Sequence, residues 1–371
     1  MGDIYYWIAL NSVPGIGRVL YKRLIEHLGS PEAVFSAAPS ELNNIDGINE
    51  KIVREIRDFK GDKEKIGDEL SKIKSAGITI ITLKDDDYPQ NLKAIYDPPP
   101  YLYVNGGLKN EDRLSVAIVG SRSATNYGRQ MTEAIGRELS LLGITIVSGM
   151  ARGIDSFAHL SALDAGGRTI AVQGCGIDIV YPPESKRLAE RIKGSGALVS
   201  EFPFGTPPEA VNFPQRNRII SGLCLGTVVV EAADDSGSLI TANCALEQGR
   251  DLFAIPGNIT SRQSSGTNSL IKKGAKLIGT ADDIIEELIP QLKGELKNIK
   301  EFKSLKEGKV VSNLSDEERV VFNVISLEPK HIDKVMMDSK LPTNKVSSIL
   351  LNMELKGAVK RLSGNMFIRG C

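Results

Sequence analysis

Short apolar segments alternate with amphipathic ones throughout residues 108–292, and this alternation limits the fold more than any other feature of the chain. Apolar runs of three or four residues are typical of strands buried on both faces, and the longer segments between them have the apolar spacing of helices. Alternating strands and helices form a mainly parallel sheet that is covered by helices on both faces. The predicted strands are 116–119, 144–147, 170–172, 197–199, 227–230 and 252–255, and the predicted helices are 127–142, 156–165, 186–193, 217–223 and 239–249.

Each predicted strand is followed by a loop of glycine, hydroxyl or charged residues. Ligands of such sheets bind at the carboxyl ends of the strands, so these loops meet where a ligand would lie. Glycine allows a phosphate to approach the backbone, N–H groups at a helix start attract anions, and an arginine fork can bind two phosphate oxygens. We therefore predict an anion site that includes Gly120, Ser121, Arg122, Gly149, Ala151, Arg152, Gly153, Gly174, Gly176, Arg216, Asn217 and Arg218.

Two groups of side chains near this edge allow more than one interpretation. Phe213 stands beside Pro214 and the arginines, where its ring is either a face for stacking a base or a core aromatic next to a turn. Four carboxylates are either general bases or structural partners of nearby amides and arginines. The structural role is favoured for them because no serine has an obvious histidine partner. These carboxylates are Asp155, Glu201, Glu231 and Asp234.

Several other kinds of site are excluded by composition and motif. The first predicted strand is followed by Gly120-Ser121-Arg122-Ser123-Ala124-Thr125, which lacks the Gly-x-Gly-x-x-Gly turn of dinucleotide-binding proteins, and no Walker lysine motif is present. The four cysteines and three histidines are scattered, so we expect neither a metal site nor a cofactor. Lys plus Arg and Asp plus Glu both number 46, so a nucleic-acid site must be a local patch. No segment approaches the roughly 20 apolar residues of a membrane span, and we expect a cytoplasmic protein with no membrane contact.

Residues 1–107 are predicted to form a helical domain. An apolar–Gly–apolar turn at 13–17 precedes a helical segment at 19–28, and a weaker copy of the pattern covers 42–56. This pattern is typical of a helix-hairpin-helix, or SAM-like, domain. Gly15 and Gly47 either let a phosphate approach the turns or only permit tight turns. The second hairpin is the weaker candidate because Asn49 stands in place of its second glycine.

The chain after the predicted sheet divides into a linker and a small domain. Residues 293–313 are rich in Lys and Glu and predict an exposed charged linker. In residues 314–371, Ser315 and Glu318 form a capping box, two more helices are predicted at 332–338 and 344–356, and a hairpin follows at 359–369. Three helices followed by a hairpin are typical of a winged helix.

The loops of the central block closely resemble those of the DNA-processing protein A (DprA, or Smf) family. The resemblance implies an extended Rossmann-like domain that binds single-stranded DNA without sequence specificity, forms a homodimer through that domain, and loads a RecA-type recombinase in natural transformation or recombination. It implies binding of DNA rather than an enzymatic activity. The matching segments are 118–122, 148–155, 174–182, 213–222, 231–241 and 249–257.

Carried over position by position, the resemblance assigns phosphate contact to Arg122 and places Phe213, Arg216, Asn217 and Arg218 in the same pocket. It also adds Ser236 and Ser238. The family often has a basic residue after its Tyr-Pro pair. Pro183 occupies that position here, and Lys186 and Arg187 are close enough to replace the charge. Gln173 and Gln215 stand where an apolar and a basic residue, respectively, are usual.

Two alternative functions remain open at this point. The first is a nucleotide-processing hydrolase on a Rossmann-like fold, although such proteins carry a Pro-Gly-Gly-x-Gly-Thr loop where this chain has residues 231–238. The second is a duplex-DNA-binding regulator that acts through the winged helix, whose third helix offers Asn344, Lys345 and Lys356.

Overall fold

The computed structural model describes most of the chain and divides it into two compact units, Met1–Gln291 and Leu292–Cys371. The predicted linker, 293–313, lies outside the described residues, as do Lys356 and Gly357. The described residues are 2–59, 61, 63–292, 314–326, 329–355, 358–362 and 364–369.

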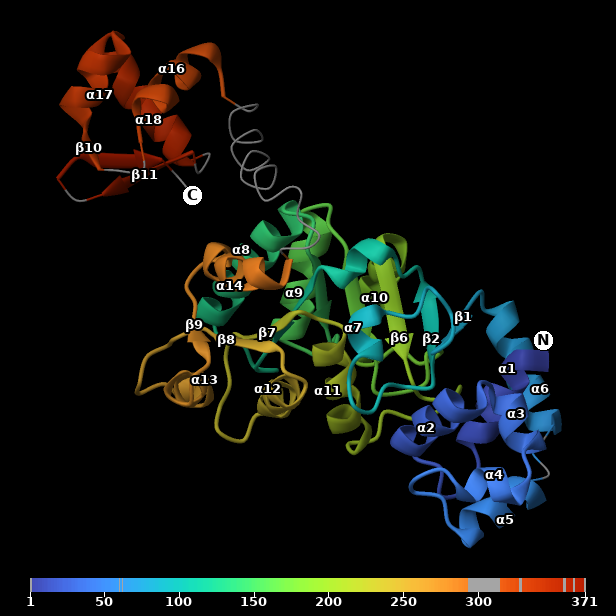
Figure 1. The fold of residues 1–371 in the computed structure, drawn as a ribbon. Coiled ribbons are helices and arrows are strands. Elements are labelled where there is room, and N and C mark those ends of the chain that lie inside the picture. Colours follow the sequence, from blue (N-terminus) through green and yellow to red (C-terminus); the bar gives the residue numbers. More distant parts are fainter. Residues whose placement is uncertain are drawn as a thin grey trace. The chain divides into compact units, whose positions relative to one another are not determined.

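A nine-stranded sheet forms the centre of the first unit (Figure 1). Its order is β1-β2-β6-β5-β4-β3-β7-β8-β9, and all pairs from β6 to β9 are parallel. The six predicted strands are confirmed as β3 to β8. The bounds are β1 Thr79–Thr82, β2 Tyr101–Gly106, β3 Ser115–Val119, β4 Thr145–Ser148, β5 Thr169–Val172, β6 Gly196–Ser200, β7 Gly226–Val229, β8 Asp251–Ala254 and β9 Lys276–Leu277.

Helices cover both faces of this sheet, which explains why its central strands are buried apolar runs. In Figure 1, α8, α9 and α10 lie on one side of the strands, and α11, α12 and α13 lie on the other. The bounds are α8 Asn126–Leu141, α9 Ile154–Asp164, α10 Lys186–Ser195, α11 Asn212–Gly222, α12 Ser238–Glu247, α13 Arg262–Lys272 and α14 Ala281–Leu292, and a short helix α7, Gln90–Lys93, lies between β1 and β2.

The structure differs from the sequence-based expectation in two places. Residues 79–106, which the sequence assigns to the helical block, contribute the antiparallel strands β1 and β2, and β2 pairs with β6. The sheet is therefore mixed rather than wholly parallel. Helix α11 begins at Asn212, five residues before the predicted start at Asn217, because Pro214 is tolerated in the first turn of a helix.

Six helices precede the sheet and form the helix-hairpin-helix part of the first unit. Gly15 and Gly47 occupy the two turns with φ of 86° and 91°, a conformation that other residues rarely adopt. The Asn49 side chain accepts a hydrogen bond from the backbone N–H of Ile52 and so caps α5. The bounds are α1 Gly2–Asn11, α2 Arg18–Leu28, α3 Pro31–Ser36, α4 Pro39–Asn43, α5 Glu50–Asp58 and α6 Lys63–Ser75.

The second unit is a winged helix. The predicted capping box is confirmed, because Ser315 Oγ accepts from the N–H of Glu318 and the Glu318 carboxylate accepts from the N–H of Ser315. A short strand that the sequence did not predict, β10, pairs with β12 and completes a three-stranded sheet. The bounds are α16 Asp316–Val324, β10 Lys330–His331, α17 Ile332–Ser339, α18 Thr343–Leu355, β11 Val359–Leu362 and β12 Met366–Arg369. Among the described residues of both units, no helix is long and apolar enough to span a membrane.

Candidate nucleic-acid interface

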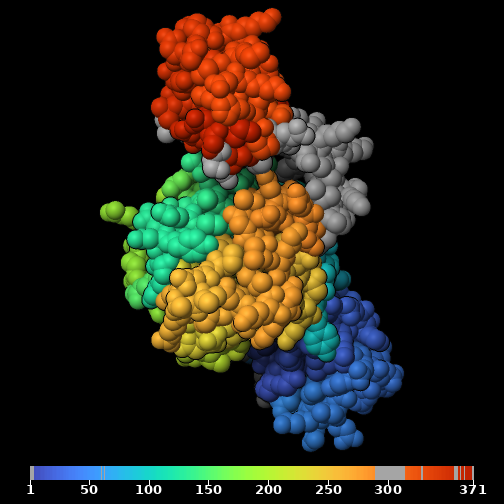
Figure 2. Space-filling view, turned by 90° about the vertical axis from the view of Figure 1, so that its left-hand side faces the viewer, coloured from blue at the N-terminus to red at the C-terminus, as the bar shows by residue number. Residues whose placement is uncertain are grey.

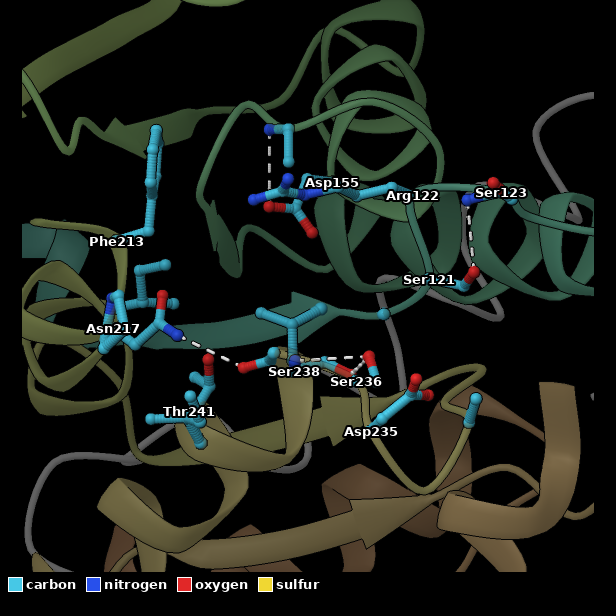
Figure 3. Close-up of a pocket in the computed structure, with 18 of the residues that line it drawn as sticks. Ser121, Arg122, Ser123, Asp155, Phe213, Asn217, Asp235, Ser236, Ser238 and Thr241 are labelled. Carbon is cyan, nitrogen blue, oxygen red and sulfur yellow. Dashed lines mark hydrogen bonds between the residues drawn. The ribbon is translucent and has the colours of Figure 1, made fainter. Parts of the chain in front are cut away.

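A pocket of about 720 Å³ opens at the carboxyl ends of β3 and β7. From β3 the chain adds strands toward β6 on one side, and from β7 it adds strands toward β9 on the other. The neighbouring strands β3 and β7 therefore mark the point where the chain changes direction across the sheet. Loops diverge at such a point and leave a crevice for ligands. Figure 3 shows Arg122 and Phe213 on one side of this pocket and Ser236 and Ser238 on the opposite side.

The loop after β3 presents Arg122 to the pocket. Glycine is required at 120 because a Cβ there would lie 2.7 Å from Cγ1 of Ile154. The buried Glu231 holds the end of the loop, since its carboxylate accepts hydrogen bonds from the N–H (2.9 Å) and the hydroxyl (2.5 Å) of Thr125. Among the described residues, no hydrogen bond or ion pair engages the Arg122 guanidinium, which is exposed and lies 5.6 Å from the centroid of the Phe213 ring.

Helix α11 supplies a second wall, in which two of the predicted site residues are fixed by contacts of their own. Arg216 is buried, and its Nη1 donates to the carbonyl oxygens of Gly149 (2.7 Å) and Val172. Asn217 Nδ2 donates to the carbonyl oxygen of Gly237 at 3.3 Å, which joins α11 to the opposite wall. Arg216 and Asn217 therefore line the pocket mainly as supports, whereas the half-buried Phe213 ring faces the open space.

Arg216 and the nearby Asp155 are buried charged groups beneath this wall, and each affects the pKa of the other. Burial lowers the pKa of Arg216 to about 10, which leaves the guanidinium charged near neutral pH. Burial also raises the pKa of Asp155, and the charge of Arg216 opposes that shift. The Asp155 carboxylate accepts from the backbone N–H groups of Gly149 (3.1 Å) and Ala151 (3.4 Å), so it orders the loop after β4.

The opposite wall is the start of α12 and carries both predicted serines. Ser236 Oγ and Ser238 Oγ lie 2.8 Å apart, and the backbone N–H of Ser238 donates to Ser236 Oγ. Hydroxyl and N–H groups at a helix start suit an anion. Two residues that the sequence did not single out stand at the rim, where Arg262 Nη2 lies 3.2 Å from Oδ2 of Asp235 and both side chains are exposed. Arg262 follows the loop at 256–258, which the sequence did mark as a strand end.

The structure separates Arg218 from the pocket although it lies on the same helix. The Arg218 side chain is only 9% exposed and donates to the Glu201 carboxylate and to the Asp97 carbonyl oxygen. Glu201 in turn accepts from Arg18 Nε (3.0 Å) and Nη2 (3.1 Å). Arg218 therefore belongs to a buried ion network that joins α2 of the helical part to α11.

The remaining predicted residues fall into three groups. Ser121 and Ala151 line the main pocket. Gly149, Arg152 and Gly174 line a smaller cavity next to the pocket, and Arg152 Nε pairs with Glu184 at 2.5 Å. Four residues line neither space: Gly153, Gly176, Lys186 and Arg187. Gly153 serves the backbone, with φ of 73° and a Cβ position only 2.3 Å from the carbonyl oxygen of Ser121.

Three of the four predicted carboxylates and the histidine of this region are engaged in local contacts, whereas Asp234 is exposed and does not line the pocket. Glu201, Glu231 and Asp155 each accept the hydrogen bonds described above. His159 is buried, its Nδ1 lies 2.6 Å from Thr169 Oγ1, and burial lowers its pKa to about 3, which keeps the ring neutral. Within the described part of the chain, no group of three or more His, Cys, Asp or Glu residues is placed to hold a metal ion.

Comparison with protein families gives a match in each part of the chain. Residues 79–289 match the model of DNA recombination-mediator protein A, 309–365 match the DprA winged helix domain, and 8–59 match a SAM-like helix-hairpin-helix tandem. The first of these begins at the same residue as β1, so it includes the two strands that the sequence assigned to the helical block.

Similar proteins cover most of the chain. Protein Smf of Synechocystis is 34% identical over 98% of both chains, and DNA processing protein DprA of Streptococcus pneumoniae is 42% identical over 67% of this chain and 86% of its own. The crystal structure of the S. pneumoniae DprA matches with a TM-score of 0.66 at 36% identity, covering 76% of this chain and 97% of its own. DprA of Helicobacter pylori, whose structure describes a single-stranded DNA binding mode, matches with a TM-score of 0.52 at 32% identity over 58% of this chain and 98% of its own.

Proposed function

The chain belongs to the DNA recombination-mediator protein A family, and we propose that it binds single-stranded DNA without sequence specificity in the pocket between β3 and β7. One observation carries the proposal. Arg122 is exposed and has no hydrogen bond or ion pair among the described residues, and its guanidinium lies over the half-buried ring of Phe213. A cation for the phosphate beside a ring for the base is the pairing that single strands require.

The shape of the pocket supports a single strand over a duplex. Phe213 and Arg122 line a concave space rather than a protruding helix or ribbon, and a base must leave its stack to meet the ring. The chain has equal numbers of positive and negative residues, so affinity comes from this local arrangement rather than from a general positive field.

The test compares fluorescence anisotropy of labelled single-stranded and duplex oligonucleotides of equal length. We expect tight, salt-sensitive binding of the single strand and weaker binding of the duplex. Phe213→Ala removes the stacking face, which contributes about 1–3 kcal/mol per base, and should therefore weaken single-strand binding about 5- to 150-fold. Phe157→Ala, on α9 outside the pocket, serves as the matched control. Equal affinity of the wild type for both DNA forms, or an unchanged affinity of Phe213→Ala, would refute the assignment.

We further propose a homodimer through the central domain, with recombinase loading on an overlapping surface. Strand β9 is at the edge of the sheet, so its outer N–H and C=O groups are free to pair with another chain. Two pairs of apolar residues lie near this edge, Leu270-Ile271 and Leu277-Ile278. Leu270 and Ile278 are buried, whereas Leu277 is 53% exposed and Ile271 is partly exposed. In Figure 2 the orange segments around α13 and α14 form a continuous part of the surface.

Leu277→Asp tests both parts of this proposal because a charge in a dimer contact opposes association. We expect the wild type to sediment as a dimer and to shorten the lag of RecA-type filament formation on single-stranded DNA. The variant should sediment as a monomer and lose part of that effect, while Leu246→Asp, another exposed leucine on α12, should resemble the wild type. A wild type that leaves the lag unchanged would refute loading, and a monomeric wild type would refute the dimer.

The alternatives receive less support from the described residues. Asp155, which lines the pocket, and Glu231, which lies behind the loop after β3, each accept a hydrogen bond from a backbone N–H group, and Asp235 at the rim pairs with Arg262, which supports binding rather than hydrolysis. On α18 of the winged helix, Lys345 Nζ lies 2.6 Å from Oε1 of Glu317, so the charge that would face a duplex is already paired. Release of free base from a nucleoside monophosphate would favour the hydrolase, and duplex binding by the whole chain that survives Phe213→Ala would favour the winged helix.

A further inference from the structure

We propose that a small cavity beside the DNA pocket accepts the exocyclic carbonyl oxygen of a base, thymine O4 or guanine O6, so that this protein prefers keto bases. The inference rests on the proposed binding of single-stranded DNA and adds a modest preference between classes of base at one position, which does not amount to reading a sequence. The cavity lies under the Phe213 ring, between the end of β5 and the start of α11.

The size of the cavity limits what can enter it. Its volume is about 40 Å³, and a water molecule needs at least about 10–15 Å³ on this measure, so about three water-sized atoms fit. A phosphate group has five heavy atoms and a whole base has more. A single exocyclic oxygen, carried by a base that stays outside, fits this volume.

The chemistry of the cavity selects an acceptor. Gln173 lines it and is only 3% exposed, and its Oε1 lies 3.8 Å from the Cys175 thiol, while its Nε2 is buried with no hydrogen-bond partner among the described residues. Arg216 also lines the cavity, and its Nε is likewise buried with no hydrogen-bond partner among the described residues. Gln173 Nε2 and Arg216 Nε can each donate a hydrogen bond but cannot accept one. A carbonyl oxygen satisfies them, whereas an amino group would bring further donors toward them.

The aromatic rings place a base at the mouth of the cavity. The Phe213 ring lies against the end of β5, where a Cβ at Gly174 would be 2.9 Å from the ring. Tyr181 lies 5.5 Å from Phe213 between ring centroids and lines the same cavity. Gln173 and Phe213 line the same cavity, so we place the edge of a base stacked on Phe213 at the Gln173 amide. Thymine O4 and guanine O6 are acceptors on that edge, whereas adenine N6 and cytosine N4 are donors.

Gln173 is also a departure from the resemblance noted in the sequence, where an apolar residue is usual at this position. An apolar side chain would offer no hydrogen bond to a base. The preference is therefore expected to depend on Gln173, and replacing Gln173 by an apolar side chain should reduce it to what Arg216 Nε alone supports.

The experiment compares oligomers of thymidine and of 5-methyldeoxycytidine on the full-length protein. The two bases share ring size and the 5-methyl group and differ at position 4, carbonyl against amino, and in the protonation of N3. One net hydrogen bond corresponds to about a fivefold change in affinity, so we expect the wild type to bind the thymidine oligomer about five times more tightly. Gln173→Leu should lose most of this preference and keep only what Arg216 Nε contributes, with the same salt dependence as the wild type because no charge changes.

The outcomes separate the two proposals. Equal binding of both oligomers by the wild type, or an undiminished preference in Gln173→Leu, would overturn the base preference and leave DNA binding intact. Failure to bind either oligomer would overturn the proposed function and this inference with it. Thermal melting checks that Gln173→Leu is folded, and Gln173→Met is the second variant if it is not.

Discussion

Replacing Arg122 with alanine should weaken binding of single-stranded DNA about 10- to 150-fold at constant salt. Hydrogen bonds to charged groups contribute about 1.5–3 kcal/mol, and the Arg122 guanidinium is free to give all of them to phosphate. Each phosphate neutralised on a single strand contributes about −0.7 to the slope of log affinity against log salt, so the slope should become shallower by about that amount. Anisotropy titrations at four or more salt concentrations measure both quantities.

The matched control is Arg137→Ala, which removes the same charge from an exposed position on α8 outside the pocket. Arg137→Ala should leave both affinity and slope close to those of the wild type. If the two variants behave alike, DNA contacts the protein elsewhere, and the pocket between β3 and β7 is not the binding site.

Replacing Glu201 with alanine should lower the free energy of unfolding of the first unit by about 3–5 kcal/mol. Removal of one partner from a buried ion pair leaves an uncompensated charge in the interior, and the cost is of this size. The Arg218 side chain is 9% exposed and would keep only its contact with Asp97, while Arg18 would lose both of its bonds to the carboxylate. Urea unfolding followed by fluorescence of Trp7, the single tryptophan of the chain, reports on this unit.

Two further variants make the interpretation specific. Glu209→Ala removes an exposed carboxylate from the loop before α11 and should change stability by less than about 0.5 kcal/mol. The double variant Glu201→Leu with Arg218→Met should be more stable than Glu201→Leu alone, because it removes the stranded charge as well. A Glu201→Ala protein that unfolds at the same urea concentration as Glu209→Ala would show that the network contributes little.

Local patterns in the sequence were sufficient to predict the central strands and the edge where the pocket forms. Strands β3 to β8 each contain a buried run of Val, Ile, Leu, Ala or Phe, and each is followed by the loop that marks its end. Strands β1 and β2 lie before the strand–helix alternation of residues 108–292, and β2 is stabilised by pairing with β6, more than 90 residues later. Pairing over such a distance leaves no periodic signal within either segment.

The sequence could not rank the arginines of the site because the difference between them is one of surroundings. Arg122, Arg216 and Arg218 all follow predicted strands or flank a predicted helix, and each is a plausible phosphate ligand by residue type. Whether each guanidinium is available to DNA depends on groups from other segments. The carbonyl oxygen of Val172 binds Arg216, and the carboxylate of Glu201 binds Arg218. Arg122 keeps its guanidinium available because no such group reaches it among the described residues.

The position of Arg216 beneath the pocket also determines where the entropic cost of binding falls. Its guanidinium fills the space beside Gly149, where a Cβ would come within 2.3 Å of Nη1, and it bridges the ends of β4 and β5. A wall that is already tied together by its own side chain loses little conformational freedom when a ligand arrives. Most of the conformational entropy lost on binding is then lost by the flexible DNA backbone. A strand whose bases stack strongly must also give up that stacking to enter the pocket, so it should bind less well.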